Sequence, residues 1–292
     1  MGGWIPALAG AVPPRLVVEF PETAPQQARQ IEELDRRRLE EAMSLVGLTS
    51  AGDSIQLVLA PEGSDIARRT PSWISGFAVG ECNAAVLFPS RVPNYPDSSF
   101  EELVLHEVGH ILVYRAAAGL PVPRWFNEGL ALYVGRPWRL GDRSRVSWAL
   151  LRRGRTALSE LDRLFGTSRA AANHAYALSG AFVQDLVRRH GPGAAARVLE
   201  GIAQGLDFEN AFEQGVGLTL MQAEESFWNR YTFWYRWIPI LSSSATLWIG
   251  ITLLFLLAAR GRRRRNSELF ERWENEEHER VTHDLNQENP EG

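Results

Sequence analysis

The chain has 292 residues, of which 45% are hydrophobic and 23% are charged, a composition typical of a folded protein and long enough for one large domain or two small ones. The formal net charge is −4: residues 260–265 contribute +5 and residues 266–292 contribute −7, which leaves −2 for the rest. The charge distribution therefore shows no basic surface that would indicate a nucleic-acid partner. The single cysteine, Cys82, excludes an internal disulfide, but a domain of this size needs none, so a location outside the cytoplasm stays open.

The first third of the chain predicts a small sheet with one long helix. Alternating or continuous apolar runs bounded by turn residues are typical of strands, and apolar residues on one side of a longer segment are typical of a helix. No internal repeat is present, and a sheet followed by helices predicts the α+β class. The predicted strands are Arg15–Phe20, Ile55–Ala60, and a pair at Ile74–Val79 and Ala84–Phe88 joined through Gly80–Asn83, and the predicted helix is Gln26–Val46.

The most informative motif is H-E-x-x-H, formed by His106, Glu107 and His110. Ser99 with Glu102 three residues later is a capping box and predicts a helix that contains the motif. Two histidines four residues apart lie on one face of a helix, so both imidazoles can bind one zinc ion, with the glutamate beside the metal-bound water. The alternative is a structural helix in which the motif arises by chance.

A second motif, W-F-N-E-G-L-A, occupies Trp125–Ala131 and contains Glu128. Seventeen residues separate His110 from Glu128, enough for the chain to end one helix, turn, and bring a second helix back against the first. A catalytic zinc takes three protein ligands and keeps one position open for water. Glu128 is either the third ligand or an ordinary surface carboxylate at a helix start, where the helix dipole favours it.

The pairing of HEVGH with WFNEGLA resembles the gluzincins, zinc peptidases whose third ligand is the glutamate of an N-E-G motif. The likeness is closest to the zinc aminopeptidase family and to the smaller bacterial peptidase MA-like domains, and it covers roughly residues 15–234. The resemblance implies one zinc ion per chain, held by His106, His110 and Glu128, with Glu107 as the general base.

One position departs from the thermolysin-like members of that group. Those proteins carry an aspartate after the third ligand, where it orients a zinc-binding histidine. In this chain Leu132 and Tyr133 occupy that region. The partner of the histidine must therefore come from elsewhere in the sequence.

The resemblance also implies groups that contact the substrate. An edge strand upstream of the zinc helix binds an extended peptide in gluzincins, and Gly76, Phe77 and Ala78 can play that part, although an ordinary sheet strand is the alternative. The oxyanion formed during hydrolysis needs a hydrogen-bond donor, for which Tyr176 and His174 are the candidates. The aminopeptidases carry a tyrosine in a Y-x-x-G setting, and here the glycine falls one position late. A core tyrosine is the other interpretation.

A membrane span is predicted near the C-terminus. Trp237–Ala259 contains 23 residues without a charge, which as a helix span about 34 Å, enough for a bilayer core. Aromatic residues crowd positions 227–237, and five arginines lie within Arg260–Arg265. Because positive residues stay cytoplasmic, the zinc motif is expected outside the cell membrane and Asn266–Gly292 inside. Met1–Pro14 is either a signal peptide shortened by a late start codon or a disordered terminus.

These features predict four regions and two alternative functions. The leading hypothesis is a bacterial, single-pass membrane-anchored zinc metallopeptidase whose substrates are peptides or proteins near the bilayer. The second hypothesis is a membrane-tethered scaffold that keeps the fold without turnover, but a scaffold does not require Glu107. The sequence leaves the choice between aminopeptidase and endopeptidase open. The predicted regions are a terminal segment 1–14, a zinc peptidase domain 15–234, a transmembrane helix 237–259, and a basic and then acidic, disordered tail 260–292.

Overall fold

The computed structural model describes residues 12–20, 25–50, 52–136, 155–241, 248–249, 251–260 and 262. The chain divides into two units, Met1–Arg230 and Tyr231–Gly292. The first unit holds a four-stranded sheet and a set of packed helices, which is the α+β class that the sequence predicts. The predicted terminal segment 1–14 lies almost wholly outside the described residues, as does most of the tail.

The sheet contains β1 (Leu16–Glu19), β2 (Ile55–Leu59), β3 (Gly76–Val79) and β4 (Ala84–Leu87). Their order is β1-β2-β4-β3, with the first two pairings parallel and the β3–β4 pairing antiparallel. A short 3-10 turn and the left-handed Asn83 join β3 to β4, as predicted for the segment between these two strands. All four predicted strands are confirmed, and β3 lies at one edge of the sheet.

The predicted helix Gln26–Val46 is wrong as a single element, because it is broken into α1 (Pro25–Glu32) and α2 (Arg36–Val46). Asp35 adopts an extended backbone conformation, and its carboxylate accepts a hydrogen bond from the backbone N–H of Arg37 at 2.9 Å. An aspartate that caps in this way satisfies one of the free N–H groups at a helix start and so favours a new helix over a continuous one.

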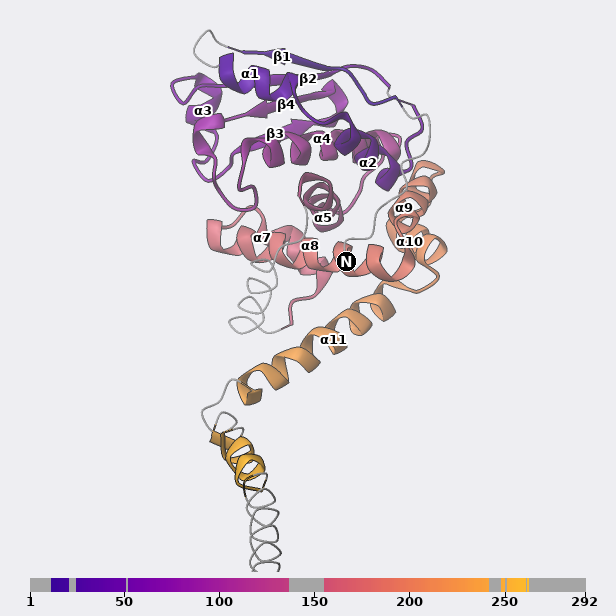
Figure 1. Cartoon of the computed structure of the whole chain (residues 1–292). Helices are drawn as coiled ribbons and strands as arrows, with labels where there is room; N and C mark the ends of the chain where they lie inside the picture. Colours follow the sequence, from indigo (N-terminus) through magenta and orange to yellow (C-terminus); the bar gives the residue numbers. More distant parts are fainter. Residues whose placement is uncertain are drawn as a thin grey trace, which may run out of the picture. The chain divides into compact units, whose positions relative to one another are not determined.

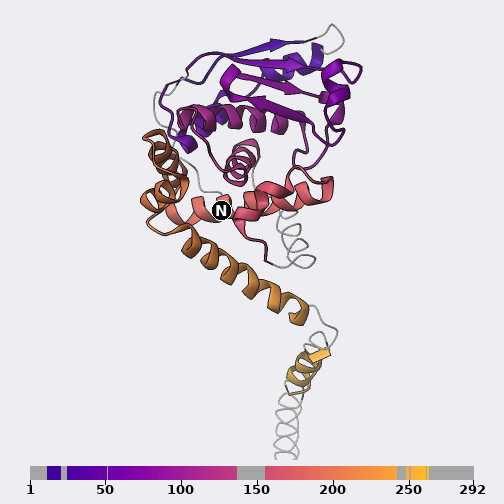
Figure 2. The ribbon, with the colours of Figure 1, turned by 180° about the vertical axis from the view of Figure 1, so that it is seen from behind.

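Three of the remaining helices stack in layers on one face of the sheet. Helix α4 packs against β3 and β4 on one side and against α5 on the other, and α5 lies between α4 and α8 (Figures 1 and 2). Helices α9 and α10 pack together beside this stack, with α9 also contacting α2. The helices that follow β2 in the chain are α3 (Asp65–Arg69), α4 (Phe100–Ala116), α5 (Arg124–Gly135), α7 (Leu158–Leu164), α8 (Arg169–His190), α9 (Gly193–Ala203), α10 (Phe208–Val216) and α11 (Leu220–Leu241), the last of which begins in the first unit and ends in the second.

Two glycines of the sequence motifs allow the three central helices to approach closely. A Cβ atom on Gly109 of α4 would lie 3.1 Å from the Cα atom of Ala131 in α5. A Cβ atom on Gly129 of α5 would lie 2.6 Å from the carbonyl oxygen of Ser179 and 2.5 Å from a methyl group of Val183, both in α8. The glycine after the motif glutamate is therefore required by the packing of α5 against α8.

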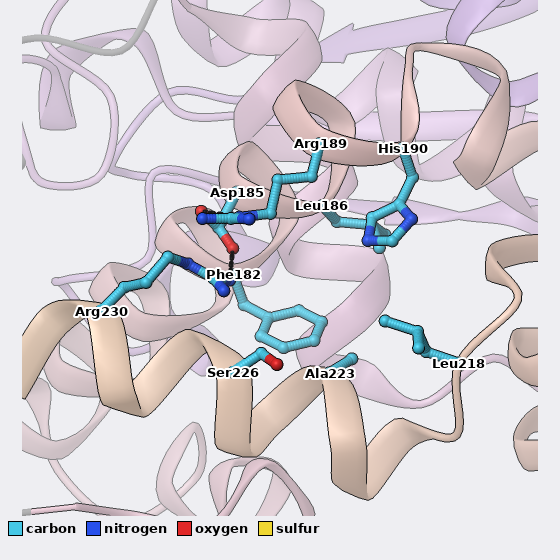
Figure 3. A pocket seen from close by; sticks show the side chains of 9 residues that line it. All are labelled: Phe182, Asp185, Leu186, Arg189, His190, Leu218, Ala223, Ser226 and Arg230. Carbon is cyan, nitrogen blue, oxygen red and sulfur yellow. Dashed lines mark hydrogen bonds and ion pairs between the residues drawn. The ribbon is translucent and has the colours of Figure 1, made fainter.

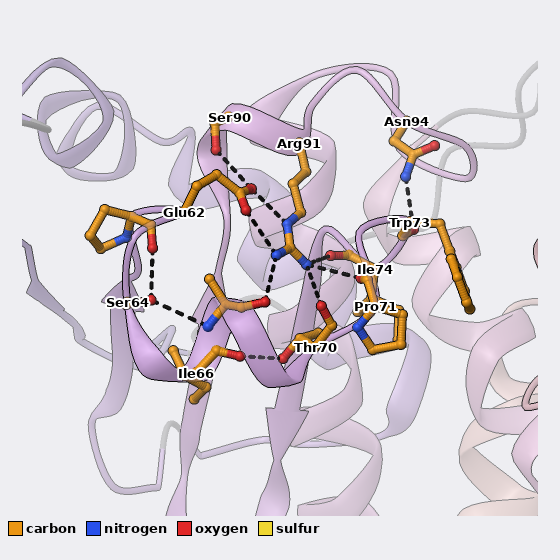
Figure 4. Close-up of polar contacts among 12 residues, drawn as sticks. Glu62, Ser64, Ile66, Thr70, Pro71, Trp73, Ile74, Ser90, Arg91 and Asn94 are labelled. Atoms are coloured by element: carbon orange, nitrogen blue, oxygen red, sulfur yellow. Dashed lines mark hydrogen bonds and ion pairs between the residues drawn. The ribbon is translucent and has the colours of Figure 1, made fainter.

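Arg91 fixes the segment that precedes β3 (Figure 4). Its buried guanidinium donates hydrogen bonds to the backbone carbonyls of Ala67 and Ile74, at 3.0 and 2.9 Å, and pairs with the Glu62 carboxylate at 2.7 Å. Asn94 adds a hydrogen bond to the Trp73 carbonyl at 2.8 Å. These bonds join the loop before the edge strand to the loop that leads into α4.

A cavity of about 220 Å³ lies between α8 and the start of α11 (Figure 3). Its apolar wall includes Phe182 and Leu186, and its charged side is occupied by Asp185. That carboxylate pairs with Arg230 and, at 3.3 Å, with Arg189, so two guanidinium groups share one carboxylate. The cluster attaches the first turns of α11 to α8.

Within the second unit, residues 251–260 form a helix whose apolar side chains are exposed; Leu254 and Phe255, for example, are 68% and 70% exposed. Among the described residues, no helix combines the length and the apolar character needed to cross a bilayer. Residues 242–247 and 250 of the predicted span Trp237–Ala259 lie outside the described part of the chain. The span therefore stays a prediction.

Candidate metal centre

Helix α4 presents the H-E-x-x-H motif in the interior of the first unit. Ser99 caps the helix, as predicted, because its hydroxyl accepts a hydrogen bond from the backbone N–H of Glu102 at 3.2 Å. The Glu102 carboxylate accepts hydrogen bonds from the backbone N–H and the hydroxyl of Ser98. In the usual capping box this carboxylate would bond to the capping residue itself, which is one residue later. The helix is buried between the sheet and α5, and His106 and Glu107 are only 3% and 4% exposed. The motif therefore lies where bulk water is largely excluded.

The structure brings the three predicted ligands together. The Nε2 atoms of His106 and His110 are 3.2 Å apart, and Oε2 of Glu128 lies 3.5 and 3.4 Å from them. Tetrahedral zinc with bonds of ~2.0–2.1 Å separates its ligand atoms by about 3.3–3.4 Å, so the triangle has the size that such an ion requires. Among the described residues, these three form the group of side chains able to hold a metal ion.

Each of the three predicted ligands also has a polar side chain beside it. The Asn127 side-chain oxygen lies 2.8 Å from Nδ1 of His110, so that nitrogen donates its proton and Nε2 keeps a free lone pair. Nε of Arg124 donates to Oε1 of Glu128 at 3.3 Å, which leaves Oε2 directed at the histidines. Both partners come from the first turn of α5, just ahead of the ligand that they help to place.

Asp97 is the partner of His106 that the sequence did not reveal. Its Oδ1 atom lies 3.7 Å from Nδ1 of the imidazole, and both atoms are buried with no hydrogen-bond partner among the described residues. The aspartate belongs to the loop before α4, where the bridge between Asn94 and Asp97 holds the backbone. In the sequence, Asp97 is one of several polar residues just before the helix, and nothing in that position connects it with His106. Only the conformation of the loop brings it close to the histidine.

The donor set fits a divalent cation. Oε2 of Glu128 is buried without a hydrogen-bond donor, and an unpartnered buried carboxylate is costly unless a cation neutralises it. Asp97 and Glu107 bring two more buried carboxylates to the same place. Two neutral imidazoles and three carboxylates together carry a charge of −3, most of which a zinc ion would offset.

The same charges shift the pKa values of the metal-free site. Burial opposes the charged form of His106, but the carboxylates of Asp97, Glu128 and Glu107 outweigh it and raise the pKa of the imidazole to about 9. Burial also disfavours ionisation of Glu128, yet the two histidines hold the pKa of this carboxyl well below its usual range. Burial raises the pKa of Glu107 to about 7, despite the two imidazoles, which lower it.

The edge strand lies directly against Glu107. A Cβ atom on Gly76 would be 2.8 Å from Oε1 of this glutamate. The carbonyl of Ser75 accepts the N–H of Phe88 at 2.8 Å, which makes these two residues a hydrogen-bonded pair of the antiparallel ladder. Because such pairs alternate, the backbone polar groups of Gly76 and Ala78 point away from β4, towards the open edge of the sheet.

Helix α8 brings Tyr176 to the same region. Its ring centroid lies 6.4 Å from that of His106 and 5.1 Å from that of Phe165. Burial, followed by the carboxylates of Glu128 and Glu107, raises the pKa of the phenol well above 10, so it carries its proton at neutral pH. His174, the other candidate donor, has its Nε2 atom 3.0 Å from the hydroxyl of Thr156 instead.

Comparison with known proteins agrees with the two motifs. The model of the Peptidase MA superfamily matches residues 66–233, more than half of the 292-residue chain, and the match includes β3, both motif helices and α8. A comparison with curated proteins finds no match. The chain therefore belongs to the Peptidase MA superfamily.

Proposed function

We propose that this protein is a zinc-dependent metallopeptidase in which His106, His110 and Glu128 hold the ion. The observation that carries the proposal is the triangle of their donor atoms, 3.2 to 3.5 Å on each side, together with the buried and unpartnered Oε2 of Glu128. Bound zinc lowers the pKa of water and polarises a carbonyl group, which is the chemistry that peptide hydrolysis needs.

Glu107 acts as the general base in this proposal. Its carboxylate accepts the proton of the attacking water and passes that proton to the nitrogen of the leaving amine, so one group serves both halves of the reaction. Burial favours this role, because it raises the pKa of the carboxyl to about 7 in the metal-free site and so brings the group near the pH at which it must exchange protons.

The edge strand β3 binds the substrate as an additional strand. The outward backbone groups of Gly76 and Ala78 can pair with an extended peptide, while those of Phe77 between them pair with β4. Gly76 also lies against Glu107, so a peptide on this edge passes the general base. The alternative, an ordinary edge strand, leaves these backbone groups to water.

Tyr176 stabilises the oxyanion by donating a hydrogen bond from its protonated phenol. Support comes from its position beside His106 and from the raised pKa that keeps the donor protonated. Tyr176→Phe is expected to lower kcat by about 10²–10³, with little change in KM, because the bond forms mainly in the transition state. A lower melting temperature with unchanged turnover would identify a packing tyrosine instead.

The central experiment compares Glu107→Gln with Glu101→Gln on the same helix. Glu101 is exposed and pairs only loosely with Arg38, at 3.8 Å, so it supplies a matched change of charge outside the site. Purified wild type is expected to contain about one zinc per chain and to cleave a broad peptide library. Glu107→Gln should keep the zinc and lose the cleavage, and Glu101→Gln should keep both.

Other outcomes distinguish the alternatives. Zinc-loaded wild type that cleaves no peptide supports a scaffold that retains the fold without turnover. Equal activity in Glu107→Gln and wild type would show that the assigned base is wrong. Full zinc occupancy in His110→Ala would show that the metal lies elsewhere.

We also propose that Trp237–Ala259 anchors the protein in the bacterial cell membrane, with the zinc domain outside. The exposed apolar side chains of residues 251–257 and the arginines that begin at Arg260 support this arrangement. The accessible substrates are then peptides or proteins near the bilayer. Protease added to intact spheroplasts should digest the zinc domain and spare a tag placed after Gly292, whereas protection of the zinc domain would reverse the topology.

A further inference from the structure

Arg124 places a positive charge beside the metal centre. It is the first residue of α5, and its backbone N–H is held by the carboxylate of Asp162 at 3.1 Å. Its guanidinium lies over the ring of Phe165, 4.8 Å from the centroid, and Phe165 in turn packs on Tyr176. Stacking on an aromatic ring and a bond to Glu128 thus fix the guanidinium beside the predicted metal ligand.

Most of the hydrogen-bonding capacity of this guanidinium is unused by the residues that the structure describes. Of its five N–H donors, the Nε–H bonds to Oε1 of Glu128, which is its one ion-pair partner in the described part of the chain. The nearby carboxylate of Asp162 is engaged with the backbone N–H groups of Arg124 and Trp125. The side chain is 52% exposed although it contacts Glu128, so a ligand has access to it beside the metal centre.

We propose that Arg124 binds a carboxylate of the substrate next to the bond that is cleaved, and so selects peptides with an acidic residue or a free C-terminus at that position. The proposal rests on the peptidase function above. The two terminal amino groups of a guanidinium can donate two parallel hydrogen bonds to the two oxygens of one carboxylate. The same charge repels a substrate ammonium group, so the site favours carboxylate recognition over the capture of a free N-terminus that an aminopeptidase requires.

The test uses the full-length, zinc-loaded protein in detergent and four fluorogenic peptides of one sequence. They carry Glu or Gln at a single internal position, each with either a free or an amidated C-terminus. The variants are Arg124→Gln and Arg124→Glu. Arg163→Gln is the matched control, because Arg163 is exposed on the neighbouring helix α7.

The measured quantity is the ratio of kcat/KM for the carboxylate peptide to that for its neutral match. Wild type and Arg163→Gln should both show a ratio of about ten or more at low salt, falling as salt is added. Arg124→Gln should reduce the ratio to near one, and Arg124→Glu should bring it below one. Loss of the contact to Glu128 affects every peptide alike and therefore cancels in the ratio. The comparison of Glu with Gln peptides tests recognition of a side-chain carboxylate. The comparison of free with amidated peptides tests recognition of the C-terminal carboxylate.

A binding measurement separates this inference from the proposed activity. In a Glu107→Gln background, labelled versions of the same peptides are titrated by fluorescence anisotropy with the metal bound. The inference is supported if the parent protein binds the carboxylate peptides more tightly and Arg124→Gln abolishes this preference. If the wild-type protein nevertheless cleaves no peptide, only the proposed peptidase function fails. Equal affinities for carboxylate and neutral peptides in the parent background, or equal cleavage ratios in wild type and Arg124→Gln, overturn it.

Discussion

The close approach of α5 to α8 predicts that Gly129→Ala destabilises the protein, although alanine is ordinarily the better helix residue. A methyl group at this position would lie 2.6 Å from the carbonyl oxygen of Ser179 and 2.5 Å from a methyl group of Val183. The valine side chain can rotate, but the carbonyl belongs to the backbone of α8 and moves only if the helix moves. Since α8 carries Tyr176, the proposed oxyanion donor would move with it.

The magnitude follows from two opposed contributions. Replacing glycine by alanine inside a helix stabilises it by about 1 kcal/mol. Overfilling a packed interior costs about 1–3 kcal/mol, and the upper end applies here because the closest polar neighbour is backbone. The expected net loss is therefore about 1–2 kcal/mol, or a melting temperature lower by about 2–8 °C for a domain of this size.

Thermal unfolding followed by circular dichroism measures this loss, and two other glycines calibrate it. Gly166→Ala should change little, because nothing lies within 4 Å of a Cβ atom there. Gly109→Ala should fall between the two, because its Cβ atom would meet the Cα atom of Ala131 at 3.1 Å. If Gly129→Ala instead raises the melting temperature, as at an ordinary helix position, the packing of α5 on α8 described above is wrong.

Four further predictions concern the metal centre, the metal-free protein and the substrate. Asp97→Ala should weaken zinc binding about 10–100-fold in a chelator competition, because His106 loses the group that orients it, and unchanged affinity would remove that role. Because the pKa of His106 is raised to about 9 without metal, zinc must displace a proton at pH 7.5, so affinity should rise with pH up to about 9 and then level off. By the same shift, the metal-free protein should lose the stabilisation that His106 provides as pH rises from about 6.5 through 9, visible as a falling melting temperature. Ala78→Pro removes an outward N–H from the edge strand, so KM should rise while stability changes little; unchanged KM would argue against substrate pairing there.

The local sequence determined those features that depend on the spacing of residues within one helix or strand. The spacing of His106 and His110 places both on one helix face wherever that helix lies, and the four short apolar runs form strands because their pattern suits a pleated, half-buried surface. The predicted helix Gln26–Val46 failed at Asp35, where a capping side chain competes with the backbone for its own N–H groups. Periodicity alone does not show which of two such local alternatives wins.

Tertiary structure decided every feature that joins distant parts of the chain. Glu128 faces the histidines only because α5 returns against α4, which Gly109 permits, and Asp97 reaches His106 only because the loop before α4 folds back over it. The same packing sets the charge of Arg124 beside the metal centre. A sequence pattern shows which face of a helix or strand is apolar. The partners of a buried charge, in contrast, depend on how the helices and strands pack. An unpaired buried charge is costly, so the stable packing is one that brings buried charges near groups of opposite charge.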